Sequence, residues 1–329
     1  MKKNVLIVTY YNACNYGAFL QAYALKKYIQ EQGMDVNIFG IELENKDNSE
    51  ENKKDFDEQL KQKLMECQKS LPVAWNIKED YDVAIIGSDE VFNFSNVTYR
   101  NCLCFDGTNI PAKKIISYAA SIGGARYRKL VLNNFSRLRK LGKLDAISVR
   151  DIRTEKLVKS FVKTKVNRSV DPTLLVDFDD EIVMPDYENF VLVYTYGMKQ
   201  EHIDFIKEYA HKRNLKIVGT GSYCEWCDIN VPVNPFEWLG LIKKSQFVFT
   251  STFHGTIFAI KYRKEFVALV DYSEKVKSLL NDFGLSERHC TTKEINKLEK
   301  LCDNKIDYSK LPIEKLIADS KEYLRREMQ

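Results

Sequence analysis

Short apolar runs alternate with amphipathic stretches along the first half of the chain. Runs at residues 5–9, 36–39, 83–86, 115–118 and 146–149 have the length of strands. Between them, residues 17–32, 127–141 and 152–161 repeat apolar side chains at helical spacing. Compact apolar strands are typical of parallel sheets that helices cover on both faces. This half therefore predicts a doubly wound α/β unit.

A second cycle begins after an acidic stretch at residues 178–188, which has the composition of a connector. Strands are predicted at 190–195, 215–219, 247–251 and 266–270, and helices at 200–213, 236–244, 256–262 and 312–328. The charged segment 45–54 predicts an exposed loop or a frayed helix start. We predict an N-terminal Rossmann-like domain (1–180), a C-terminal Rossmann-like domain (181–305) and a final helix (306–329) that packs back on the first domain.

Composition narrows the class of protein. The 329 residues are 44% hydrophobic and 29% charged, which is ordinary for a globular protein of two domains. The net charge of +4 is spread along the chain without a basic block, so nucleic acid is not an expected partner. No apolar run reaches the length of a membrane span, and the N-terminus lacks a signal-peptide pattern. We expect a cytoplasmic protein.

The eight cysteines are expected to be thiols in a reducing compartment. Ligand-like spacing occurs in Cys224-x-x-Cys227 and Cys102-x-Cys104, but these pairs are far apart in the sequence and neither has a nearby histidine. We therefore expect no metal site and no cofactor.

The main candidate for chemistry is the turn after the strand at 247–251. Ligands of open α/β sheets bind beyond the carboxyl ends of the strands, which is where this turn lies. Ser251 and Thr252 offer hydroxyls, and His254 and Gly255 open a helix whose N–H groups and positive dipole end favour an anion. The alternative is that Ser251 or Thr252 only caps the helix and His254 packs within the turn.

Arg150 is the second candidate because it follows an apolar strand. A cation in that position needs an anionic partner, and a guanidinium fork suits a phosphate or a carboxylate. The alternative partner is the neighbouring Asp151. Two further turns, Asn15-Tyr16-Gly17 and Gly87-Ser88-Asp89, also follow strands, although each alone is ordinary turn chemistry.

Six sequence segments, taken together and in order, indicate a protein family more specifically than any one of them does alone. They are NYGAFLQAYAL at residues 15–25, GSDEVFN at 87–93, SYAASIG at 117–123, SVRD at 148–151, VDPTLL at 170–175 and STFHGT at 251–256. In this order they resemble the polysaccharide pyruvyl transferase family, over about residues 5–285. The resemblance implies a GT-B-like α/β fold, in which two Rossmann-type domains with parallel sheets face an interdomain cleft.

The resemblance also implies an activity and partners. The family transfers pyruvate from phosphoenolpyruvate to two hydroxyls of a sugar as a cyclic ketal, in the biosynthesis of surface or capsular polysaccharides. The expected partners are phosphoenolpyruvate and a sugar or lipid-linked oligosaccharide acceptor. A lipid-linked acceptor would bring the protein to the inner face of the membrane.

Site residues follow from the family's Ser-x-Phe-His-Gly element and from its arginine after the Ser-Val strand. The expected catalytic residues are His254, Arg150 and Asp89, with His254 as an acid/base or as a stabiliser of the departing phosphate. Asp89 or Asp171 is the candidate base for the acceptor hydroxyl. The residues expected to bind substrate are Asn15, Tyr16, Gly17, Gly87, Ser88, Ser251, Thr252, Gly255 and Lys275.

The chain departs from the family pattern at two places. Glu90 and Phe92 stand where the family often has Gln and Trp, and Lys275 or Lys277 stands near a usual arginine. Lysine lacks the bidentate fork of arginine.

Three other functions are alternatives. A nucleotide-sugar glycosyltransferase of the same fold would use Gly219-Thr220-Gly221 and Glu225, and a non-catalytic member of the fold would need neither His254 nor Arg150. A dinucleotide-binding oxidoreductase is disfavoured because residues 10–17 lack the Gly-x-Gly-x-x-Gly spacing.

Overall fold

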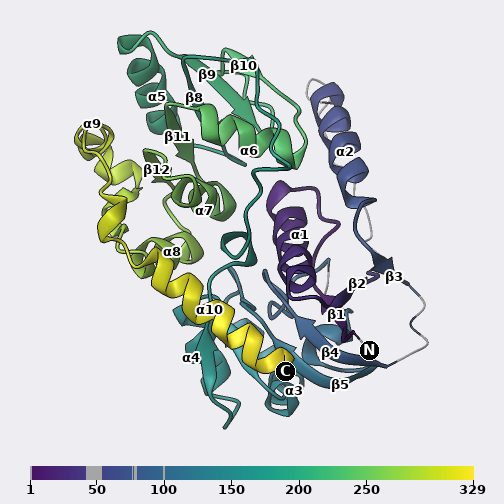
Figure 1. Ribbon diagram of the computed structural model, residues 1–329. Helices are drawn as coiled ribbons and strands as arrows, with labels where there is room; N and C mark the ends of the chain where they lie inside the picture. Colours follow the sequence, from purple (N-terminus) through teal and green to yellow (C-terminus); the bar gives the residue numbers. More distant parts are fainter. Residues whose placement is uncertain (1, 42–53, 76, 78–79, 99–100) are drawn as a thin grey trace.

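The computed structural model describes residues 2–41, 54–75, 77, 80–98 and 101–329. Two parallel sheets, one in each half of the chain, are flanked by helices (Figure 1). This confirms the α/β class with two parallel sheets that the apolar runs predict. The predicted loop at 45–54 lies outside the described residues, except for its last residue.

The first sheet has the strand order β3-β2-β1-β4-β5. Its strands are β1 (Asn4–Val8), β2 (Asp35–Phe39), β3 (Val73–Ala74), β4 (Tyr81–Ile86) and β5 (Ala112–Ser117). A parallel pair, β6 (Ile147–Val149) and β7 (Val166–Arg168), extends this sheet through bridges from Ile116 to Ala146 and from Ala120 to Val149. The loops after β1, β4 and β6 therefore meet along one edge.

The second sheet has the strand order β10-β9-β8-β11-β12-β13. Its strands are β8 (Phe190–Tyr194), β9 (Lys216–Thr220), β10 (Ile229–Asn230), β11 (Phe247–Thr250), β12 (Phe266–Leu269) and β13 (His289–Cys290).

 The central strands of this sheet are fully buried, among them β8, β11 and β12, which spans Phe266–Leu269. Their apolar runs carry no alternation because helices cover both faces.

Ten α-helices are present in the described residues. They are α1 (Tyr16–Glu31), α2 (Lys54–Gln68), α3 (Tyr127–Lys140), α4 (Ile152–Lys159), α5 (Gln200–Lys212), α6 (Pro235–Lys244), α7 (Phe253–Lys261), α8 (Glu274–Asp282), α9 (Leu298–Asp303) and α10 (Ile313–Met328). Short 3-10 helices include η4 (Pro172–Leu174). Periodicity did not predict α2, α8 or α9. In α2 only Phe56, Leu60 and Leu64 are buried, so its apolar stripe is narrow.

Aromatic side chains join the two halves through α1. The ring of Tyr16 stacks on Tyr194 and Trp238, at centroid distances of 5.7 and 5.1 Å, and Phe19 meets Phe236 at 5.8 Å. An apolar interface of this kind restricts motion between the halves. We therefore treat the space between the two sheets as preformed.

Helix α10 runs back across the first sheet, so the two termini lie close together (Figure 1). The hydroxyl of Tyr323 donates to the carbonyl of Ser117 at 2.9 Å, and Lys3 Nζ donates to the carbonyl of Met328 at 2.9 Å. The domain boundaries at residues 180 and 305 stay predictions.

Candidate functional site

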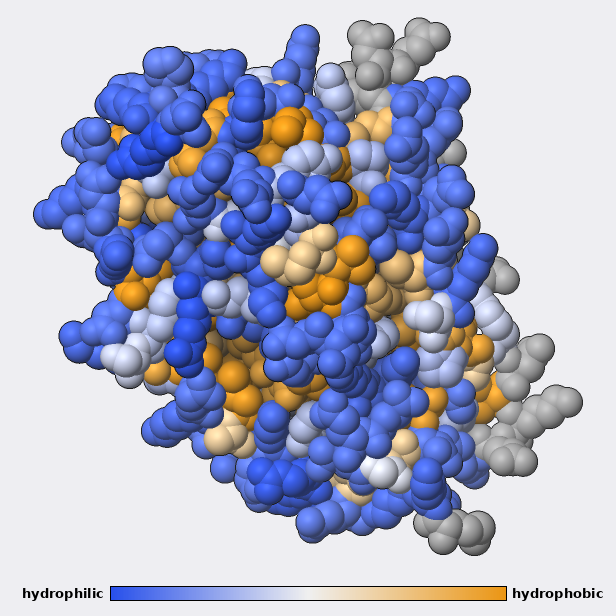
Figure 2. Space-filling model, turned by 45° about the horizontal axis from the view of Figure 1, so that its top comes forward, coloured by the Kyte–Doolittle hydropathy of each residue, from blue (hydrophilic) through white to orange (hydrophobic). Residues whose placement is uncertain are grey.

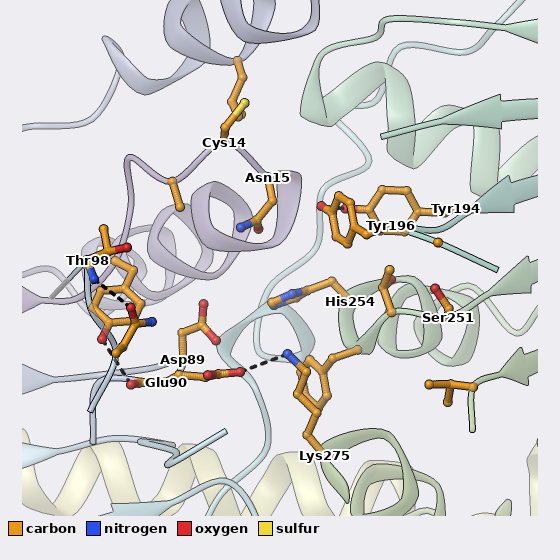
Figure 3. Close-up of a pocket in the computed structure, with 18 of the residues that line it drawn as sticks. Cys14, Asn15, Asp89, Glu90, Thr98, Tyr194, Tyr196, Ser251, His254 and Lys275 are labelled. Atoms are coloured by element: carbon orange, nitrogen blue, oxygen red, sulfur yellow. Dashed lines mark hydrogen bonds and ion pairs between the residues drawn. The ribbon is translucent and has the colours of Figure 1, made fainter. Parts of the chain in front are cut away.

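A cavity of about 1350 Å³ lies between the two halves, at the carboxyl ends of both sheets. On the face shown in Figure 2, hydrophobic residues gather toward the middle of the molecule, between largely hydrophilic regions. Figure 3 shows side chains from both halves converging on the cavity. The predicted site residues that line it are Asn15, Asp89, Ser251, Thr252, His254 and Lys275.

Several other predicted residues lie behind the cavity wall. Tyr16 is buried in the interface, where its hydroxyl donates to the carbonyl of Val233 at 3.0 Å, and burial raises its pKa well above the usual value. Ser88 is buried, and its hydroxyl donates to Gln21 Oε1 at 2.7 Å. Gly87 has φ of +127°, and a Cβ there would lie 2.1 Å from the carbonyl oxygen of Tyr118. These residues shape the wall rather than reach the cavity.

The loop after β4 presents Asp89 to the cavity in an uncommon conformation. Its φ of +69° lies in the left-handed region, which few residues other than glycine adopt. Such conformations persist where the surrounding structure fixes them, and they cluster at functional sites. The neighbouring Gly87 and Ser88 therefore matter because they build the turn that aims Asp89.

His254 lies directly against the first turn of α1. A Cβ added at Gly17 would be 1.9 Å from His254 Nδ1, so only glycine leaves room for the imidazole. Gly255 has a similar role, because a Cβ there would be 2.2 Å from the hydroxyl oxygen of Thr250. Gly17 and Gly255 thus permit close approach and do not line the cavity.

Two helix N-termini border the cavity at His254. Asn15 caps α1 by accepting from Ala18 N at 2.7 Å, and Thr252 caps α7 by accepting from Gly255 N at 2.9 Å. Thr252 therefore does cap its helix, as the alternative interpretation held, while it also lines the cavity. Each helix start still has first-turn amides and a positive dipole end that favour an anion.

A buried charge network lies beneath His254. Arg150 NH1 donates to Asp171 Oδ2 at 2.7 Å, and Arg150 NH2 donates to Asp89 Oδ1 at 3.2 Å. The guanidinium also lies 4.1 Å from the ring centre of Phe253. Its partners are therefore Asp89 and Asp171, and not Asp151, which caps α4 instead.

Asp171 links this network to the histidine. Its Oδ2 atom lies 3.7 Å from His254 Nε2, close enough for an ion pair with a protonated imidazole and too far for a hydrogen bond. Burial disfavours the charge on Asp171, but His254 and Arg150 together outweigh burial and lower its pKa. Burial likewise disfavours the charge on Arg150, but the carboxylates of Asp89 and Asp171 outweigh it and raise its pKa. Arg150 and Asp171 are therefore both charged at neutral pH.

The two departures from the family pattern meet across the cavity. Glu90 Oε1 and Lys275 Nζ form an ion pair at 3.0 Å, which joins the loop after β4 to the start of α8 (Figure 3). Gly123 leaves room for Glu90, since a Cβ there would lie 2.0 Å from Glu90 Oε2. Lys275 therefore shares its charge with Glu90.

Other residues that line the cavity were not predicted. Tyr196 and Lys199 follow β8, Asp271 and Tyr272 follow β12, and Trp75 follows β3. The rule that ligands bind beyond strand ends would have found the loops after β8 and β12. It would not have found Trp75, because a strand of two residues leaves no periodic signal in the sequence.

The residues that a nucleotide-sugar glycosyltransferase would use, Gly219-Thr220-Gly221 and Glu225, lie outside the cavity. Thr220 is buried, with its hydroxyl donating to the carbonyl of Val231 at 2.7 Å, and Gly221 packs against the ring of Tyr194. Neither these residues nor Glu225 lines the cavity.

Two further observations concern metals and membranes. No group of three histidine, cysteine, aspartate or glutamate side chains among the described residues could hold a metal ion, and none of the eight cysteines forms a disulfide. Across that same part of the chain, no helix is both long and apolar enough to cross a membrane.

Solved structures of UDP-GlcNAc 2-epimerases are similar to this chain. The enzyme from Methanocaldococcus jannaschii has a TM-score of 0.54 at 11% identity, with 99% of each chain covered. The enzyme from Neisseria meningitidis has a TM-score of 0.52 at 13% identity, again with 99% of each chain covered. At such low identity the likeness concerns the fold alone, and it confirms the predicted GT-B-like architecture.

Sequence comparison gives the family. No curated protein matches the chain significantly. A family model described as polysaccharide pyruvyl transferase matches residues 15–274, which include the first turn of α1, the loop after β4 and the His254 turn. The chain therefore belongs to the polysaccharide pyruvyl transferase family.

Proposed function

We propose that this protein transfers pyruvate from phosphoenolpyruvate to two hydroxyls of a sugar, forming a cyclic ketal on a surface or capsular polysaccharide or its precursor. The observation that carries the proposal is that His254 lies 3.7 Å from Asp171, which is paired with the buried Arg150, beneath the point where α1 and α7 begin. A histidine backed by a carboxylate and flanked by two helix N-termini suits a substrate that carries a phosphate and needs a proton transferred.

The donor is proposed to lie on the side of the second sheet. The amides at the starts of α1 and α7 and the hydroxyls of Ser251 and Thr252 would hold its phosphate and carboxylate. Arg150 is buried and engaged by two carboxylates, so we assign it to positioning rather than to direct contact. It keeps Asp89 and Asp171 in place.

Ketal formation can be written with its protons balanced. One sugar hydroxyl adds to C2 of phosphoenolpyruvate while the methylene carbon gains a proton and becomes a methyl group. The second hydroxyl then adds to C2 as the C2–O bond to phosphate breaks. The two hydroxyls lose two protons in all. One of them balances the proton that the methyl group gains, and the other leaves with phosphate.

His254 and Asp89 are assigned to the two ends of this proton transfer. His254 Nε2 faces Asp171, so we place its proton there and leave Nδ1 to exchange a proton with the donor. Asp89, which the loop after β4 presents to the same cavity, accepts the proton of the attacking hydroxyl (Figure 3).

The proposal is tested by incubating the protein with phosphoenolpyruvate and a panel of neutral mono- and oligosaccharides. Phosphate release and a product heavier by one pyruvate ketal are expected with at least one sugar. His254→Gln is expected to lower kcat at least about a hundredfold with little change in the KM for phosphoenolpyruvate. A raised KM with unchanged kcat would instead make His254 a phosphate-binding residue.

Thermal shift separates the nucleotide-sugar alternative. We expect stabilisation by phosphoenolpyruvate and none by UDP, because the residues considered for a nucleotide do not line the cavity. Stabilisation by UDP alone would refute the proposed donor.

A further inference from the structure

The cavity extends from His254 to the outer part of the first sheet, where it is lined by Trp75. This side chain follows β3 and is 56% exposed, whereas Trp238 is fully buried in the interface. A large exposed aromatic surface inside a cavity marks a contact site more often than one on a convex face does. The proposed chemistry at His254 does not use Trp75.

The indole of Trp75 packs against the backbone at Gly40. A Cβ added at Gly40 would lie 2.6 Å from both Cδ2 and Cε3 of Trp75, so the ring covers the side-chain position of this glycine. Gly40 N also donates to the carbonyl of Ala74 at 2.9 Å, which fixes the loop that carries the indole. The ring is therefore supported on one side, and 56% of Trp75 is left exposed by the described part of the chain.

Helix α2 supplies the neighbouring wall. Met65 is 49% exposed and lines the cavity with Lys61 and Gln68 from the same face of the helix. The helix is anchored to the second half by an ion pair of 3.1 Å between Lys63 and Glu237. Apolar surface bordered by amide and amine groups matches a sugar ring, which has apolar C–H faces and a rim of hydroxyls.

The position of Trp75 sets the size of the ligand. The ends of β3 and β4 are separated by three strand spacings, about 14 Å, and β4 leads into Asp89. A sugar ring stacked on Trp75 therefore lies toward the other end of the cavity from Asp89. A ligand that occupies both ends must be a chain of sugars.

We propose that Trp75, Gly40 and Met65 form a remote subsite that stacks a neutral sugar ring of an oligosaccharide acceptor, away from the ring that receives pyruvate. The proposal rests on the proposed function for the identity of the acceptor as a glycan. It adds that the acceptor is an oligosaccharide, and that the affinity for it depends on residues outside the reacting centre.

Tryptophan fluorescence tests this subsite without phosphoenolpyruvate. Neutral mono-, di- and tetrasaccharides of glucose, galactose and mannose are titrated into the protein. The longer saccharides are expected to shift the emission of Trp75 to the blue as the sugar displaces water. Trp75→Ala is expected to weaken binding, measured by calorimetry, by about tenfold. Gly40→Ala should weaken binding similarly, because its Cβ displaces the indole.

Tyr187→Ala is the matched control, since Tyr187 is an exposed aromatic that does not line the cavity. It should bind saccharides as the wild type does. Equal affinity of Trp75→Ala and wild type, or the absence of saccharide binding, overturns the proposal. A preference for alkyl detergents over saccharides also overturns it, because the platform would then hold an apolar chain.

The two proposals fail separately. If saccharides bind through Trp75 but phosphoenolpyruvate yields neither phosphate nor ketal, the pyruvyl transfer is refuted and the sugar subsite stands. If ketal forms at equal rates in wild type and Trp75→Ala with long acceptors, the transfer stands and the subsite is refuted.

Discussion

Replacing Gly17 with alanine probes the contact between α1 and His254. The added Cβ would lie 1.9 Å from His254 Nδ1, whereas ordinary contacts begin at 3.4 Å. The imidazole must therefore retreat by about 1.5 Å, the difference between these two distances. Its side chain is 11% exposed and packs against Phe253, so a shift also disturbs its approach to Asp171.

The expected effect is on catalysis more than on folding. A misplacement of about 1 Å in a reacting group can cost about a hundredfold in rate, which equals about 2.7 kcal/mol in the activation barrier. Alanine is favoured over glycine within a helix by up to about 1 kcal/mol, which offsets part of the strain. We expect Gly17→Ala to fold and to lose about a hundredfold in kcat.

The assay is phosphate release from phosphoenolpyruvate with a competent acceptor, alongside the midpoint of thermal unfolding. Gly142→Ala is the control, because a Cβ there has no neighbour closer than 3.8 Å outside its own helix turn and φ is not positive. It should keep the wild-type kcat. A Gly17→Ala variant with wild-type kcat would refute the assignment of His254, because the imidazole would then be free to move without consequence.

Two further predictions concern the charged groups of the cavity. Asp171→Asn removes the buried carboxylate that faces both Arg150 and His254 and leaves Arg150 with Asp89 alone, so we expect a loss of about 3–5 kcal/mol in the free energy of unfolding at pH 7, measured with urea. The pKa of Asp171 is lowered from 3.8, so this stability is present above about pH 4 and is lost as pH falls further; the variant and the wild type should converge at low pH, and a constant difference would contradict the lowered pKa. Glu90→Gln frees Lys275 from its ion pair, and we expect the KM for phosphoenolpyruvate to fall a few-fold at low salt while unfolding changes by less than about 1 kcal/mol. An unchanged KM at low ionic strength would show that Lys275 does not face the donor.

The pattern of the sequence was sufficient for the fold class. Central strands such as β8 and β11 are buried on both faces, and their continuous apolar runs are readable without any knowledge of their neighbours. The helix starts at Asn15 and Thr252 could also be predicted from the sequence, because capping is a local interaction over three residues. Helix α2 was missed because few of its residues are buried.

The candidate site was predicted in part. The turns that carry Asp89 and His254 were found because ligand sites follow strand ends, and both residues line the cavity. Tyr16 and Ser88 belong to the same turns but point into the core, and nothing in the local sequence distinguishes the two directions. Trp75 follows a strand too short to be recognised.

The sequence by itself determined two parallel-sheet units, the helix starts that could bind an anion, and the family motifs. The tertiary structure alone decided which charges meet: Arg150 with Asp89 and Asp171, Glu90 with Lys275, and Asp171 with His254. The physical reason is that local propensity and burial act over a few residues, whereas pairings between groups on different elements depend on how two sheets and the helices between them pack.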